Sequence, residues 1–186
     1  MKYFSTLSLL TFLFIQSCNS QDTIAKIPTT KFPIDKDRGD SLMTRIPQAR
    51  GFINDFFKLF NDNEIQTLDS LVRSYEKVTT VEIVVATIDS AMAGAHEFED
   101  YCLVMLNTWG VGKKTKNNGI LIVISPDLRK IRVENGYGIE KALSNAETKE
   151  IVDNVFIPKI KEGKYFEGVR NGIIAITKKL NQNGKY

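Results

Sequence analysis

The sequence predicts a single layered α/β domain over residues 51–180, in which a small mixed β-sheet has helices on both faces. Two mostly apolar, β-branched runs, 81–88 and 119–124, have the composition of strands that are buried on both faces. A segment with helical spacing lies between them, and an alternating segment at 130–134 follows a proline-containing turn. Two buried strands joined by a helix should be parallel, and 130–134 should return antiparallel. This order of elements indicates a layered α/β architecture.

Capping residues and apolar spacing predict the helices. Asn61 and Glu64 have the form of a capping box, and apolar residues at helical spacing continue from there to about Lys77. Further helices are predicted where apolar residues recur every three or four positions: 96–109, 146–156 and 166–180. Glycines end the first of these, and a proline and a glycine separate the other two.

The amino terminus has the pattern of a bacterial secretory signal. Lys2 is the only charge in residues 1–17, and the stretch that follows is apolar but too short to span a bilayer. It ends in Ile15-Gln16-Ser17-Cys18, which resembles the lipobox of bacterial lipoproteins. Residues 1–17 are therefore predicted to be a signal peptide, with Cys18 as the lipidated first residue of the mature chain. The alternative is a secreted soluble protein with an incidental cysteine.

Composition predicts the remaining organisation and excludes several classes of site. Residues 18–50 contain three prolines and no sustained period, so they are predicted to be a flexible tether, and 181–186 a short tail. Lys and Arg number 25 against 22 Asp and Glu, an even balance that gives no indication of nucleic-acid binding. With Cys18 lipidated, no disulfide is expected, and Cys102 is predicted to be a small buried hydrophobe. The single histidine excludes sites that need two imidazoles.

Short motifs in a fixed order make residues 51–180 similar to the TPM-domain family. Each is weak alone, but together they cover most of the domain: Phe52-Ile53-Asn54-Asp55, Glu99-Asp100-Tyr101, Trp109-Gly110-Val111-Gly112, Asn117-Asn118-Gly119-Ile120-Leu121, Arg132-Val133-Glu134 with Gly136-Tyr137-Gly138, Ile157-Pro158 and Phe166-Glu167-Gly168.

The resemblance implies a compact α/β domain on the extracytoplasmic or lumenal side of a membrane. Plant chloroplast members are associated with photosystem repair and acid phosphatase activity, and calcium binding is reported for the family. Many members carry a transmembrane helix after the domain. Because no such helix follows residue 180 here, the lipid on Cys18 is the expected anchor, and the expected location is the bacterial cell envelope.

Oxygen donors in the domain form a candidate calcium site, because calcium takes six to eight oxygen ligands in irregular geometry. The donors are Asp55, Asp100, Asn118, Asp127 and Glu134. The alternative for each of them is a capping, turn or solvated residue. Arg132 and Tyr137 are candidates for binding a phosphate or for lining a pocket, although an Arg on an alternating strand often pairs with a neighbouring carboxylate.

The predicted strand order places these candidates at two opposite edges of the sheet. Asn118, Glu134 and Tyr137 should fall at one edge, which has more of the family-like residues. Asp127 and the start of the 96–109 helix, which carries Asp100, should fall at the other. That second edge lies beyond the carboxyl ends of the parallel strands, where open α/β sheets usually bind ligands. The two arguments disagree about which edge has the site.

Two functions from different classes follow. The first is a non-catalytic, calcium-responsive binding or assembly module, held on the envelope membrane and acting with envelope membrane proteins. The second is a metal-assisted acid phosphatase for phosphomonoesters, in which carboxylates hold the metal and Arg132 or the lysines of the 113–116 loop hold the phosphate. The absence of a convincing nucleophile and base pair in the sequence favours the first.

Overall fold

A four-stranded sheet in the order β1-β2-β3-β4 organises residues 34–184, the part of the chain that the computed structural model describes. The strands are β1 (Ile53–Asp55), β2 (Glu82–Thr87), β3 (Gly119–Ser125) and β4 (Lys130–Asn135). The first three are parallel and β4 is antiparallel to β3, which confirms the predicted mixed sheet. Only β1 was not predicted, because three residues are too few to show a period.

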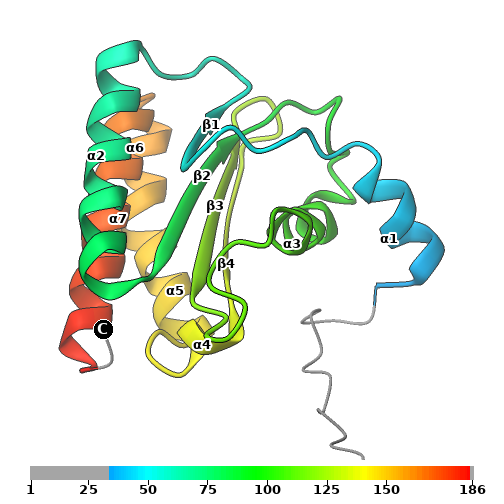
Figure 1. The fold of residues 1–186 in the computed structure, drawn as a ribbon. Helices are drawn as coiled ribbons and strands as arrows, with labels where there is room; N and C mark the ends of the chain where they lie inside the picture. Colours follow the sequence, from blue (N-terminus) through cyan, green and yellow to red (C-terminus); the bar gives the residue numbers. More distant parts are fainter. Residues whose placement is uncertain (1–33, 185–186) are drawn as a thin grey trace, which may run out of the picture.

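Helices cover both faces of the sheet, as predicted (Figure 1). On one face lie α2 (Asp62–Thr79), α5 (Asn145–Ile151), α6 (Ile157–Lys161) and α7 (Tyr165–Gln182), while α4 (Tyr137–Glu140) follows β4 directly. On the other face lies α3 (Phe98–Trp109), with α1 (Lys36–Met43) packed on its outer side.

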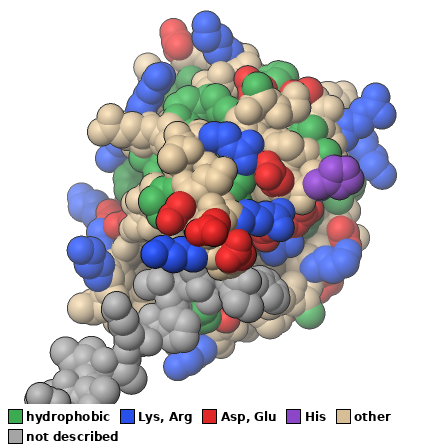
Figure 2. Space-filling view, turned by 90° about the vertical axis from the view of Figure 1, so that its right-hand side faces the viewer, with side chains coloured by type: hydrophobic (Ala, Val, Ile, Leu, Met, Phe, Trp, Pro, Cys, Tyr) green, Lys and Arg blue, Asp and Glu red, His purple; other side chains and the backbone are tan. Residues whose placement is uncertain are grey.

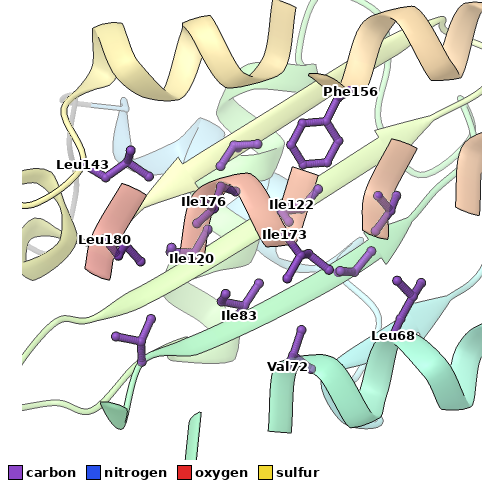
Figure 3. Close-up of a cluster of buried hydrophobic side chains, with 14 of the residues drawn as sticks. Leu68, Val72, Ile83, Ile120, Ile122, Leu143, Phe156, Ile173, Ile176 and Leu180 are labelled. Carbon is purple, nitrogen blue, oxygen red and sulfur yellow. The ribbon is translucent and has the colours of Figure 1, made fainter. Parts of the chain in front are cut away.

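The larger core fills the space between the sheet and helices α2 and α7. Branched aliphatic side chains from alternate positions of β2 and β3 point toward this face because successive strand residues point to opposite sides. They meet side chains from α2 and α7 (Figure 3), which include Leu68, Val72, Ile83, Ile120, Ile122, Ile173 and Ile176. The capping box that begins α2 is present as predicted, with Asn61 and Glu64 each accepting from the other's backbone N–H.

The second core lies between the sheet and α3. Phe98 and every residue from 101 to 106 are buried, because the sheet covers one side of α3 and α1 covers part of the other. Cys102 is among these residues, as predicted, and burial raises the pKa of its thiol. Gly110 then ends the helix in the left-handed conformation at a φ of 61°.

Helix α1 lies inside the segment predicted to be tether. Leu42 is its one fully buried side chain, and Arg38 is ion-paired with Asp100 of α3 at 2.8 Å. Its eight residues are mostly charged or polar, so the sequence contains no apolar period from which this helix could be predicted. The ordered chain therefore extends beyond the predicted domain start toward the amino terminus.

The helices after β4 also differ from the prediction at Pro158. Instead of ending there, the chain passes from α5 through a π-helical turn, η1 (Val152–Phe156), into α6. Proline lacks an N–H and its ring clashes with the carbonyl four residues earlier in a regular helix. The wider π turn accommodates Pro158 near the start of α6, and the break falls at Gly163 instead.

The predicted signal peptide, Cys18 and the tether up to residue 33 lie outside the described residues. Among residues 34–184, no helix has the length and hydropathy needed to cross a membrane.

Candidate functional site

The strand register places the candidate residues at the two edges that the sequence predicted. Gly119 is opposite Glu82, and Leu121 is opposite Glu134, so Asn118 and the chain after β4 fall at the amino-terminal edge of the parallel strands. Asp55, Thr87 and Ser125 end β1, β2 and β3 at the carboxyl-terminal edge. The two edges differ sharply in how much space they leave for a ligand.

Glycines pack three backbone segments against one another at the amino-terminal edge. A Cβ on Gly119 would lie 2.1 Å from the Val111 carbonyl oxygen, and one on Gly136 would lie 2.3 Å from that of Asn117. At Gly138 the corresponding distance, to the Lys116 oxygen, is 2.0 Å. These residues are glycine because backbone approaches backbone there.

Asn118 connects two segments at the same edge by side-chain hydrogen bonds. It is fully buried, its side-chain nitrogen donates to the Thr80 carbonyl at 2.8 Å, and its side-chain oxygen accepts from the Lys113 backbone N–H at 3.0 Å. Lys113 itself pairs with Glu82 at 2.6 Å. The family-like residues of this edge therefore fix the 110–118 loop against the start of β2.

Glu134 and Arg132 form a pair on the α3 face of β4. Arg132 Nε lies 2.6 Å from Glu134 Oε1, and Glu134 is 1% exposed. Its other oxygen, Oε2, has no hydrogen-bond partner among the described residues. The pairing of Arg132 with a neighbouring carboxylate is the alternative that the sequence left open. Tyr137, half-buried, opens α4 beyond the same end of β4.

Asp55 and Asp127 organise turns at the carboxyl-terminal edge. Asp55 accepts from the backbone N–H groups of Leu59 and Phe60, at 2.9 and 2.8 Å, and from the Thr87 hydroxyl. Asp127 accepts from the Ser90 backbone N–H at 2.7 Å and from the Ser125 hydroxyl at 2.8 Å. Both carboxylates thus have structural hydrogen bonds.

The five predicted calcium donors do not surround one point. Asp55 and Asp127 lie at one edge, Asn118 lies at the other, Glu134 is buried beside Arg132, and Asp100 is paired with Arg38. No group of three acidic, His or Cys side chains in residues 34–184 is placed to hold a metal ion. The residues therefore do not fit calcium as one ligand set, and calcium binding stays a prediction.

A groove of about 830 Å³ lies at the carboxyl-terminal edge, where ligands of open α/β sheets usually bind. The end of β3, the start of β4 and the turn between them line it, with Ile131 on the edge strand β4. The start of α3 lines one side, and η1 and α6 line the other. The apolar lining side chains are Phe98, Ile124, Pro126, Ile131, Val152, Ile157, Ile160 and Tyr165.

The acidic side chains of the groove are ion-paired, whereas some of its basic side chains are not. Lys130 Nζ lies 3.1 Å from Glu99 and donates to the Ala95 carbonyl at 2.6 Å, and Asp153 is ion-paired with Lys149. Desolvation would raise the pKa of Glu99, but its own backbone and Lys130 lower it, so this pair stays ionised. Arg129 and Lys161, by contrast, have no ion pair within residues 34–184. The groove therefore has surplus positive charge.

Outside the groove, the α1 and α3 side carries both signs of charge. Figure 2 shows acidic and basic side chains interleaved across the middle of this face. Arg38 with Asp100 and Arg45 with Glu97 are two of the ion pairs in this region. Mixed charges of this kind do not form the clustered basic face that nucleic-acid binding requires.

Comparison with known proteins places the chain in a family. The sequence model of the TPM domain matches residues 53–179, so the chain belongs to the TPM-domain family. Among solved structures it is similar to the N-terminal domain of a Porphyromonas gingivalis (P.gingivalis) protein, with 28% identity, a TM-score of 0.65, and coverage of 75% of this chain and 88% of that one. The N-terminal domain of a Corynebacterium glutamicum protein shares the fold, with 12% identity, a TM-score of 0.52, and coverage of 71% and 82%. No curated protein matches the sequence.

The groove contains residues that the sequence did not indicate. Arg129, Lys161, Ile160 and Tyr165 line it, yet none belongs to a motif or a donor cluster. Ile160 and Lys161 line the groove because the chain continues through η1 into α6. The sequence did not predict this continuation, because Pro158 indicated that the helix ends. The rule that ligands bind beyond the carboxyl ends of parallel strands was the one usable signal for this edge.

Asp127 makes stability depend on pH. Desolvation would raise its pKa, but hydrogen bonds from Ser90, Ser125 and Leu128 lower it from 3.8 to about 2. A depressed folded-state pKa stabilises the domain above pH 3.8, and this stabilisation is lost as the pH falls toward 2. Urea unfolding should show Asp127→Asn clearly less stable than wild type at pH 6 and nearly equal to it at pH 2. Asp40→Asn, on exposed α1, is the control, and an equal deficit of Asp127→Asn at both pH values would contradict the assignment.

Proposed function

We propose that this TPM-domain chain is a membrane-anchored, extracytoplasmic binding module, and that it engages envelope proteins through the groove at the carboxyl-terminal edge. The proposal rests on the properties of the groove. Its volume is in the range of ligand sites, its lining is mainly apolar, and a few charged groups stand at its rim. At the opposite edge, glycine backbones are in contact, and the pocket that includes Glu82 and Val111 has a smaller volume of about 310 Å³.

The groove supports binding more than catalysis. Ser125 is fully buried and donates its hydroxyl hydrogen to Asp127, so it is neither exposed nor next to a free base. His96 does not line the groove. Arg129, Lys130 and Lys161 could bind a phosphate, which keeps acid phosphatase as the second candidate. Arg132, the predicted phosphate ligand, is paired with Glu134 instead.

The anchor is the second part of the proposal. A lipidated Cys18 would hold the mature chain on the membrane, because each buried methylene of an acyl chain contributes about 0.8 kcal/mol. The described domain begins packing at α1, so a tether of fewer residues than predicted would separate it from the bilayer. Replacing Cys18 by alanine is the change that removes the anchor and leaves the domain intact.

Photo-crosslinking in cells tests both parts. A photoreactive amino acid would replace Tyr165, in the groove, or Val78, which is 83% exposed on α2. We expect a discrete adduct with an envelope protein from position 165 and none from 78, and loss of this adduct and of membrane fractionation in Cys18→Ala. Equal labelling from both positions, or a Cys18→Ala protein that still sediments with membranes, would contradict the proposal.

A further inference from the structure

β4 is an edge strand whose backbone hydrogen bonds alternate in direction. Gly136 N–H donates to the Gly119 carbonyl at 2.8 Å, so Gly119 points its backbone groups toward β4. Ile124 points its groups the other way, since its carbonyl accepts from Ile88 at 2.9 Å. By this alternation, the Ser125–Lys130, Val123–Arg132 and Leu121–Glu134 pairs are the hydrogen-bonded ones in the β3–β4 ladder.

Ile131 and Val133 therefore point their backbone N–H and C=O groups away from the sheet. Val133 is 8% exposed and contacts the core beneath η1, whereas half-buried Ile131 lines the groove. Within residues 34–184, no hydrogen bond satisfies the outward groups of Ile131. A peptide N–H and C=O that face a groove form a template for a further strand.

The groove has room for the side chains of such a strand. Strand residues point alternately to opposite faces, so an added strand would direct one set of side chains toward Phe98 of α3. The other set would meet Ile157 and Ile160 of α6. Lys130 and Arg132, charged side chains of the kind that often protects an edge, are held in ion pairs with Glu99 and Glu134, and no proline occurs in β4.

The charges at the groove select among possible strands. Arg129 is the last residue of the turn before β4, and Lys161 ends α6. Neither has an ion pair in the described part of the chain. Both acidic residues of the groove are already paired with lysines. A strand with acidic residues beside its apolar ones would complement this surplus.

We propose that β4 accepts, as a fifth strand, an extended partner segment that alternates apolar residues and carries acidic ones. This inference rests on the proposed function and specifies the ligand class of the same groove. Backbone hydrogen bonds to Ile131 would supply affinity, the apolar walls would accept alternate side chains, and Arg129 and Lys161 would select acidic segments.

The test uses the full mature chain and a defined probe, the peptide acetyl-Glu-Val-Thr-Val-Thr-Val-Glu-amide. Amide hydrogen exchange and NMR shifts report binding residue by residue. We expect the Ile131 amide to become protected when the peptide is added. Replacing the peptide's glutamates by lysines should weaken binding about tenfold, as should Arg129→Glu.

Ile131→Pro supplies the matched comparison, because proline is tolerated in an edge strand where its missing N–H faces outward. We expect Ile131→Pro to weaken peptide binding about tenfold, and Ile131→Ala, which keeps the N–H, to weaken it much less. If Ile131→Pro fails to fold, N-methylation of the central peptide valine removes a peptide N–H that would donate to the β4 edge, and this loss of a backbone hydrogen bond should weaken binding by a similar factor.

Several outcomes would overturn the inference. Protection of the Ile131 amide in the free monomer would indicate that residues 19–33 of the chain itself occupy the edge, and concentration-dependent dimers would indicate a second copy. Peptide binding unaffected by Ile131→Pro and by N-methylation would exclude strand addition. If the crosslink from position 165 persists in those cases, the groove is still a binding site, so the proposed function stands although the ligand class fails.

Discussion

Replacement of Gly119 by alanine is expected to destabilise the domain by about 3 kcal/mol or more. The new methyl would lie 2.1 Å from the Val111 carbonyl oxygen and 2.8 Å from the Gly112 nitrogen. Both are backbone atoms, so no side-chain rotation relieves the contact. The neighbouring Asn118 is fully buried and hydrogen-bonded on both sides, which prevents the loop from moving away.

Urea unfolding monitored by circular dichroism measures this effect. Gly94→Ala is the control, since its nearest heavy atom is the flexible Glu97 Oε2 at 3.7 Å. We expect Gly94→Ala to stay within about 0.5 kcal/mol of wild type. A Gly119→Ala protein as stable as Gly94→Ala would show that the glycines of this edge are not required by backbone packing.

Phe156→Ala is expected to lower the free energy of unfolding by about 3–5 kcal/mol. Phe156 is the last residue of η1 and is fully buried against α7, where Gly172 makes room for its ring. A Cβ on Gly172 would lie 2.0 Å from a ring carbon of Phe156. The π turn and this glycine thus act as one packing unit on the sheet.

A double-mutant cycle isolates that unit. Gly172→Ala should destabilise the wild-type background because of the clash with the ring. In the Phe156→Ala background it should stabilise by about 1 kcal/mol, because alanine favours the helix over glycine and the clash is gone. Urea unfolding of the four proteins measures the change of sign. Additive effects would contradict the contact.

The sequence predicted the parts of the fold that carry strong local signals. The β-branched runs of β2 and β3, the alternation in β4 and the Asn61 capping box all gave elements that the structure confirms. Three features lacked such a signal. β1 is three residues long, α1 is stabilised by Leu42 and ion pairs to α3, and η1 places Pro158 inside a continuous helical path.

The sequence predicted the two edges of the sheet, but neither which edge has the candidate site nor which residues line it. The strand order indicated two edges, and the register confirms that assignment. Which residues line the groove depends on side-chain packing between α3, β4 and α6, which are distant in sequence. Motif residues gather at the amino-terminal edge because close backbone packing there requires glycines and the hydrogen-bonded Asn118.

We therefore propose different roles for the two edges of the sheet. The amino-terminal edge stabilises the fold, so substitutions there should change the free energy of unfolding. The carboxyl-terminal groove is the proposed binding site, so substitutions there should change binding while leaving stability nearly unaltered. Ile160, half-buried in the groove wall, is a position at which this separation can be measured.

The most direct measurement is the crosslink yield from position 165 in cells that carry Ile160→Glu, beside Val78→Glu as the matched surface change. We expect Ile160→Glu to abolish the adduct while its melting temperature stays within a few degrees of that of Val78→Glu, which should crosslink like wild type. An undiminished adduct in folded Ile160→Glu protein would contradict the assignment of the groove as the binding site.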